Sequence, residues 1–175
     1  DLASARERVT ARTRALLVQH TFGIPADVEA ARALADEHGL ALLEDCVHSL
    51  GATWDGRPTG ALGDAGFFST EETKMLSTTM GGMVVTDDTE LDAGLRAQRA
   101  TFAVPERSLT NRYLLKLVAY QALTQPHLHA WARAAYERLG ERQPLPTPTE
   151  PEELAGGRRS DYEQQLGAGQ AVIGS

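Results

Sequence analysis

Residues 15–45 contain two short apolar runs on either side of a segment with helical periodicity. The runs, ALLVQH (15–20) and LALLED (40–45), have the length and composition of buried strands. Between them, apolar residues recur at helical spacing and a glycine follows as a candidate C-cap: Val28, Ala31, Leu34, Ala35 and Gly39. Strand, helix and strand within about 30 residues predict a βαβ unit with a parallel strand pair and a right-handed crossover.

The middle of the chain is predicted to continue the sheet. The glycine-rich stretch at 54–66 is typical of a loop, and residues 66–70 and 81–88 have the pattern of two further strands. A helix is expected over 89–100, with Thr89 as its N-cap.

From Asn111 the pattern changes to helical, and Pro126 is expected to break it into two helices. The predicted organisation has four parts: the α/β region at 1–110, a helical pair at 111–141, a proline-rich linker at 142–157 and the start of a further helix at 158–175. The apolar side chains of the helical pair need a partner to pack against. The sequence is compatible with the sheet, another protein or a membrane surface.

Composition narrows the class of protein. A chain of 175 residues with 42% hydrophobic content has room for one domain with a core. The net charge of -7 argues against nucleic acid as a partner, because phosphate binding needs clustered Lys and Arg. No apolar run reaches the roughly 20 residues of a membrane span. Cys46 is the single cysteine, so a reducing compartment such as the cytoplasm is expected.

Two acidic residues, Glu44 and Asp45, stand where the second apolar run ends. In an open parallel sheet, ligands bind beyond the carboxyl ends of the strands, so an acid at this point can meet one. The alternative is a helix N-cap or a loop carboxylate, and these two residues alone leave both interpretations open.

Lys74 lies between two predicted strands in polar surroundings that are rich in hydroxyl side chains, with Glu71 and Glu72 as the nearby charges. Hydroxyl side chains precede and follow it: Ser69, Thr70, Thr73, Ser77, Thr78 and Thr79. A nucleophilic lysine must lose its proton part of the time, which a desolvated site with few anions favours. The alternative is an ordinary surface lysine. Ser69, at a strand end and followed by backbone N–H groups, is a candidate phosphate ligand.

An acid, a lysine and a phosphate-holding serine at one sheet edge together suggest pyridoxal 5'-phosphate. That cofactor requires a lysine for its Schiff base and a carboxylate on its pyridine nitrogen. No metal-ligand motif is apparent. A Rossmann dinucleotide site is disfavoured, because GALGDAG (60–66) leads into a strand, whereas that fingerprint opens a helix directly after a strand.

Four motifs then point to a family. They are H-x-x-G from His20, E-D-x-x-(Q/H)-x-x-G-A from Glu44, the glycine-rich loop that runs into F-S, and a lysine five residues after the serine with GGMVVTD beyond it. Residues 14–99 resemble the DegT/DnrJ/EryC1/StrS aminotransferases, pyridoxal phosphate enzymes that put amino groups on nucleotide-linked keto sugars.

The resemblance implies a role for each candidate residue. Lys74 would form the Schiff base, Asp45 would partner the pyridine nitrogen, and Ser69 would hold the phosphate. His48 stands where the family usually has glutamine, near the ring and its phenolic oxygen. His20 has no defined role, and a buried histidine with satisfied hydrogen bonds is the plainer interpretation.

The implied fold is α/β, part of the large domain of an aspartate aminotransferase-like transferase with a mostly parallel sheet and an inserted helical segment. Near the end of the chain, Glu163 stands where the family has an asparagine that contacts the neighbouring subunit's phosphate. We expect the chain to be a central piece of a longer protein that forms a homodimer.

The expected function is therefore transfer of an amino group, with glutamate as donor and a nucleotide-linked keto sugar as acceptor. Two alternatives stay open. One is a sugar dehydratase of the same family, although family members with that activity replace the lysine with histidine. The other is a non-catalytic homologue or regulator, which would need neither Lys74 nor Asp45.

Overall fold

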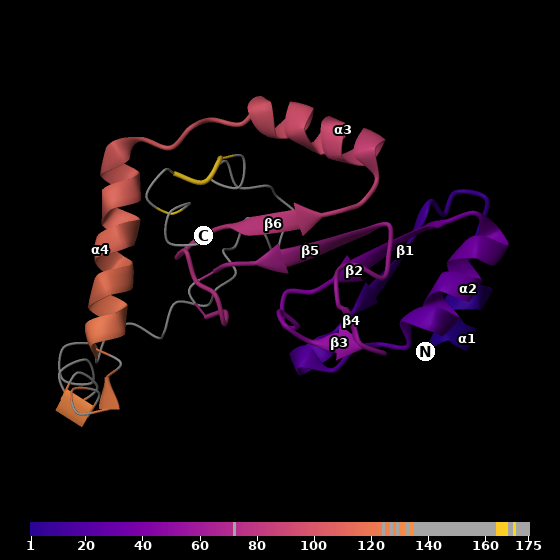
Figure 1. The fold of residues 1–175 in the computed structure, drawn as a ribbon, viewed down its shortest axis with the longest axis horizontal. Coiled ribbons are helices and arrows are strands. Elements are labelled where there is room, and N and C mark those ends of the chain that lie inside the picture. Colours follow the sequence, from indigo (N-terminus) through magenta and orange to yellow (C-terminus); the bar gives the residue numbers. More distant parts are fainter. Residues whose placement is uncertain are drawn as a thin grey trace. The chain divides into compact units, whose positions relative to one another are not determined.

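The structure is a computed structural model, and it describes residues 1–71, 73–123, 125–126, 128, 130–131, 134, 164–167 and 170. The chain divides into two compact units, Asp1–Gln98 and Arg99–Ser175. Figure 1 labels the helices and strands.

A four-stranded sheet forms the centre of the first unit, with strand order β1-β2-β5-β6. Its strands are β1 (Ala15–Gln19), β2 (Ala41–Asp45), β5 (Ala65–Ser69) and β6 (Gly82–Val85). β1 pairs with β2 and β2 with β5 in parallel, while β6 runs antiparallel to β5 at the edge (Figure 1). The predicted α/β fold with a mostly parallel sheet is confirmed.

The helix α2 (Val28–His38) links β1 to β2 and packs on both. The apolar residues predicted to face the core, Val28, Ala31, Leu34 and Ala35, are all buried. The hydrophobic core consists of three of them together with residues of the strands: Val28, Ala31, Ala35, Val18, Leu40 and Leu42. Asp27 caps the first turn, and Gly39 ends the helix in the left-handed conformation (φ 62°) that glycine adopts without strain. The short helix α1 (Leu2–Glu7) packs against α2.

The loop expected at 54–66 contains a hairpin of β3 (Thr53–Trp54) and β4 (Arg57–Pro58). Its two turn residues, Asp55 and Gly56, both have positive φ (48° and 76°). Two left-handed residues make the turn whose twist suits a tight hairpin, and Asp-Gly is a favoured pair for it. The Asp55-Gly56 dipeptide could therefore have predicted this hairpin from the sequence.

The helix α3 (Thr89–Ala100) has the predicted bounds, but the predicted cap is wrong. Asp88 caps it, because its Oδ1 accepts hydrogen bonds from the backbone N–H groups of Glu90 and Leu91 at 2.8 and 2.9 Å. A carboxylate is also the better cap here, since it offsets the positive end of the helix dipole.

In the second unit, α4 (Arg107–Leu123) begins four residues before the predicted start and ends before Pro126. The backbone of Ala103 bridges to Gln164. The remaining parts predicted for 124–175 lie largely outside the described residues, and Glu163 is among those left out. No helix in the described part of the chain is both long and apolar enough to cross a membrane.

Candidate active site

Three polar side chains share one face of the sheet near the carboxyl ends of its parallel strands. Val18 and Leu42 point into the core beneath α2, so the next residues on the same strands point to the opposite face. Gln19 pairs with Asp45 in register, and Asp45 pairs with Phe67, two residues before Ser69. Gln19, Asp45 and Ser69 therefore lie on the face that α2 leaves uncovered.

The carboxylate of Asp45 is fixed by two hydrogen bonds. Gln19 Nε2 donates to Oδ2 at 2.9 Å, and the backbone N–H of Val47 donates to Oδ1 at 3.1 Å. Together the two bonds hold the carboxylate in one orientation. Asp45 is half-buried, which leaves part of it accessible at the strand end.

His48, Ser69 and Lys74 line one cavity of about 230 Å³. Its wall also includes Phe22, Cys46 and Val47, together with Leu50, Thr73, Met75 and Leu76. Asp45 does not line this cavity, although the next three residues along the chain do. The structure thus brings three of the four predicted site residues together and sets the fourth directly beside them.

Lys74 is half-buried, and it forms no ion pair with a carboxylate of the described residues. The nearby carboxylate of Glu71 is occupied by Thr73, whose backbone N–H and hydroxyl donate to it at 3.1 and 2.6 Å. Ser69 Oγ accepts a bond from the backbone N–H of Glu71 at 3.3 Å. The described carboxylate nearest to Lys74 in the sequence, that of Glu71, is therefore hydrogen-bonded to Thr73 and forms no ion pair with Lys74.

Phe22 is a member of the cavity wall that the sequence did not single out. Its ring stacks on that of His48, with centroids 5.7 Å apart and an angle of 7° between the planes. Its backbone is left-handed (φ 54°, ψ 31°), which costs a bulky residue on the order of 1–3 kcal/mol. An offset aromatic pair contributes about 0.5–1.5 kcal/mol. Because Phe22 is 84% exposed, burial adds little, so stability alone does not account for this conformation.

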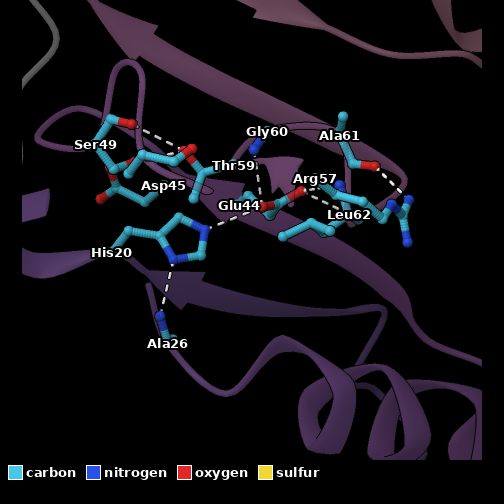
Figure 2. Close-up of polar contacts among 12 residues, drawn as sticks. His20, Ala26, Glu44, Asp45, Ser49, Arg57, Thr59, Gly60, Ala61 and Leu62 are labelled. Atoms are coloured by element: carbon cyan, nitrogen blue, oxygen red, sulfur yellow. Dashed lines mark hydrogen bonds and ion pairs between the residues drawn. The ribbon is translucent and has the colours of Figure 1, made fainter. Parts of the chain in front are cut away.

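Glu44 faces away from the cavity side of the sheet and is fully buried. Its carboxylate accepts four hydrogen bonds, from the backbone N–H groups of Gly60, Leu62 and Gly63 at 2.6–2.8 Å and from His20 Nε2 at 3.0 Å. Figure 2 shows the side chain between the His20 ring and the glycine-rich loop. Of the two acids at the end of β2, only Asp45 is left to meet a ligand.

The hydrogen bonds of His20 define its tautomer. Nδ1 accepts from the backbone N–H of Ala26 at 3.0 Å and carries no proton, so Nε2 carries the proton and donates it to Glu44 (Figure 2). Burial would raise the pKa of Glu44, but its hydrogen bonds to Gly60, Gly63, His20 and Leu62 more than offset this and lower the pKa. His20 is thus a buried histidine with both ring nitrogens satisfied.

Cys46 lies close to this pair, and one ligand atom from each of His20, Glu44 and Cys46 falls within 4.8 Å of the others. Both histidine nitrogens and both carboxylate oxygens already form hydrogen bonds, as described above. Burial also raises the pKa of the Cys46 thiol to about 11, which keeps it protonated. A metal ion would have to displace these bonds, so the cluster is structural.

Comparison with known proteins identifies relatives of this chain. A family model described as the DegT/DnrJ/EryC1/StrS aminotransferase family matches residues 1–122. An L-glutamine:scyllo-inosose aminotransferase from Streptomyces griseus is 46% identical over 98 residues, which are 56% of this chain and 23% of the relative. A UDP-N-acetyl-3-dehydro-alpha-D-glucosamine 3-aminotransferase from Acidithiobacillus ferrooxidans is 42% identical over 99 residues, 56% of this chain and 27% of the relative.

Solved structures agree with this grouping. DesI, crystallised in the presence of its TDP-sugar product, is 45% identical with a TM-score of 0.56, over 57% of this chain and 26% of DesI. The GDP-4-keto-6-deoxy-D-mannose-3-dehydratase of E. coli, with bound hydrated PLP, is 33% identical with a TM-score of 0.53, over 59% of this chain and 26% of the dehydratase. This chain spans about a quarter of the length of the relatives named here.

Proposed function

Because this chain belongs to the DegT/DnrJ/EryC1/StrS aminotransferase family, we propose that its protein moves an amino group from glutamate to a keto group on a nucleotide-linked sugar. The family cofactor is pyridoxal 5'-phosphate, as predicted from the sequence and as seen bound in a solved relative. One observation carries the proposal for this chain: an amine, a hydroxyl and an imidazole line one cavity beside an oriented carboxylate.

The chemical groups around the cavity match those of the cofactor. The amine of Lys74 suits the aldehyde, the hydroxyl of Ser69 suits the phosphate, and the carboxylate of Asp45 suits a protonated pyridine nitrogen. The imidazole of His48 can donate to or accept from the phenolic oxygen. When bound, the cofactor supplies an electron-accepting ring that allows the substrate Cα–H bond to break.

The residues of this chain would divide the work between binding and proton transfer. Asp45, held by Gln19 and Val47, keeps one orientation and stabilises positive charge in front of it. The hydroxyl of Ser69 would bind the phosphate group of the cofactor. The amine of Lys74 would move a proton to and from the substrate carbon as a general base and acid.

A keto-cyclitol is a second candidate acceptor, and glutamine a second candidate donor. The relative from Streptomyces griseus is named as an L-glutamine:scyllo-inosose aminotransferase, whereas other relatives are named for nucleotide sugars. A dehydratase is the remaining alternative, because solved relatives include one. Lys74 supports transamination over dehydration. A homodimer and a cytoplasmic location complete the proposal and rest on the family resemblance and on the single cysteine.

A transfer assay separates these candidates. The full-length protein with pyridoxal phosphate is given glutamate or glutamine labelled with ¹⁵N, together with a nucleotide-linked keto sugar or a keto-inositol. Label in an amino sugar nucleotide is the expected result. Label in an amino-inositol would favour the second acceptor, loss of water without label would establish the dehydratase, and absence of any turnover would favour a non-catalytic homologue.

A further inference from the structure

The Thr21–Gly23 turn is bound firmly to the carboxyl end of β2. The backbone N–H of His20 donates to the carbonyl of Asp45 at 3.1 Å, and the His20 ring donates to Glu44. A Cβ atom placed on Gly23 would come within 3.4 Å of the His48 carbonyl oxygen, so the turn lies directly against the segment that carries His48. The residues on either side of Phe22, His20 and Gly23, are therefore held against the end of β2 and the segment that follows it.

His48 has few other restraints. It is exposed, and its ring forms no hydrogen bond with any described residue. The near-parallel stack with Phe22 is the contact that orients it. An exposed imidazole without such a contact would sample several rotamers, and a group that must meet a cofactor ring works best when it is held in place beforehand.

We propose that Phe22 is a positioning residue that holds the His48 imidazole in one plane at the cavity wall, ready to meet the cofactor ring. This accounts for a large aromatic residue at a left-handed, solvent-exposed position, where a glycine or asparagine would avoid the backbone strain. The inference rests on the proposed function only in assigning the cofactor as the group that His48 meets.

The first test measures the stack itself in the full-length protein without cofactor. With ¹³C-labelled histidine, His48 ring protons are expected to carry a ring-current shift from Phe22. Phe22→Leu should abolish that shift, and Phe22→Tyr should retain it. Unchanged His48 resonances in Phe22→Leu would overturn the proposal, and this result does not depend on whether the protein binds pyridoxal phosphate.

The second test asks whether Phe22 acts through His48, using a double-mutant cycle on the dissociation constant of pyridoxal phosphate. Phe22→Leu is expected to weaken binding about 2- to 12-fold, the range expected for one aromatic pair, and Phe22→Tyr less than about twofold. In a His48→Ala background, Phe22→Leu should have no further effect. Equal effects in both backgrounds would contradict a positioning role. If the wild type bound no cofactor, the proposed function would fail while the first test still stood.

Discussion

Gln19 and Asp45 end neighbouring parallel strands in register, and the amide of one donates to the carboxylate of the other at 2.9 Å. This contact lies on the sheet face that α2 does not cover, where the last side chain of β2 lies beside the candidate site. The carboxylate predicted to partner a pyridine nitrogen is therefore oriented by a residue 26 positions earlier in the chain.

Replacing Gln19 with leucine should weaken binding of pyridoxal phosphate. The change keeps the size of the side chain but removes the donor that orients Asp45, and a hydrogen bond to a charged group contributes about 1.5–3 kcal/mol. We expect the dissociation constant, followed by the cofactor's absorbance, to rise at least about tenfold. Glu29→Gln, on the exposed side of α2, is the matched control and should leave it unchanged. Equal affinity in Gln19→Leu and wild type would exclude this role for Gln19.

Glu44→Ala should destabilise the fold rather than affect the cavity alone. It leaves three backbone N–H groups of the glycine-rich loop and the His20 Nε2–H without their acceptor inside the protein. Leaving a buried donor without its acceptor costs about 1–3 kcal/mol for each group. Urea unfolding measures the loss, again with Glu29→Gln as control. A loss no larger than that of the control would show that the loop does not depend on Glu44.

The same residue predicts a pH dependence of stability. The folded-state pKa of Glu44 is lower than its ordinary value of 4.5, so the stabilisation is present above about pH 4.5 and is lost as the pH falls through the folded pKa. The free energy of unfolding of the wild type should therefore drop below pH 4.5. Glu44→Gln should show a smaller drop over that range, and a drop of equal size would assign the acid sensitivity to other groups.

Gly66→Ala should be much more damaging than Gly39→Ala. A Cβ atom at Gly66 would meet the Gly60 backbone, with the carbonyl oxygen only 2.8 Å away, and neither backbone segment can yield cheaply. We expect a loss of about 3 kcal/mol or more, at the upper end of overpacking costs. Gly39 faces open space, so its substitution costs only the left-handed strain of about 1–2 kcal/mol. Thermal unfolding of the two variants gives the comparison, and similar losses would contradict this packing.

The elements around α2 could be predicted because their signals are local. Apolar spacing of 3.6 residues, a glycine after His38 and two short apolar runs act within a few residues of one another. The N-cap of α3 was predicted wrongly because Asp88 and Thr89 are adjacent and both are favoured N-cap residues. Which of them caps the helix depends on where its first turn begins.

The parts of the site that could not be predicted depend on contacts between strands and loops. The pairing of Gln19 with Asp45 follows from the register of β1 and β2, which neither strand specifies alone. Glu44 is buried and Asp45 lies on the opposite face because of which face of β2 packs under α2, and the sequence of β2 alone does not specify that face. The left-handed conformation of Phe22 has no sequence signal, because bulky residues rarely adopt it.

Lys74 is proposed to carry the cofactor, and borohydride reduction of the full-length protein tests this assignment. Addition of pyridoxal phosphate should produce a visible absorbance band that borohydride abolishes, and peptide mapping should then find the reduced cofactor attached to Lys74. Lys74→Arg, which keeps the charge but not the nucleophile, should show neither the band nor the attachment. Attachment to another lysine, or an unreactive wild type, would show that Lys74 does not carry the cofactor.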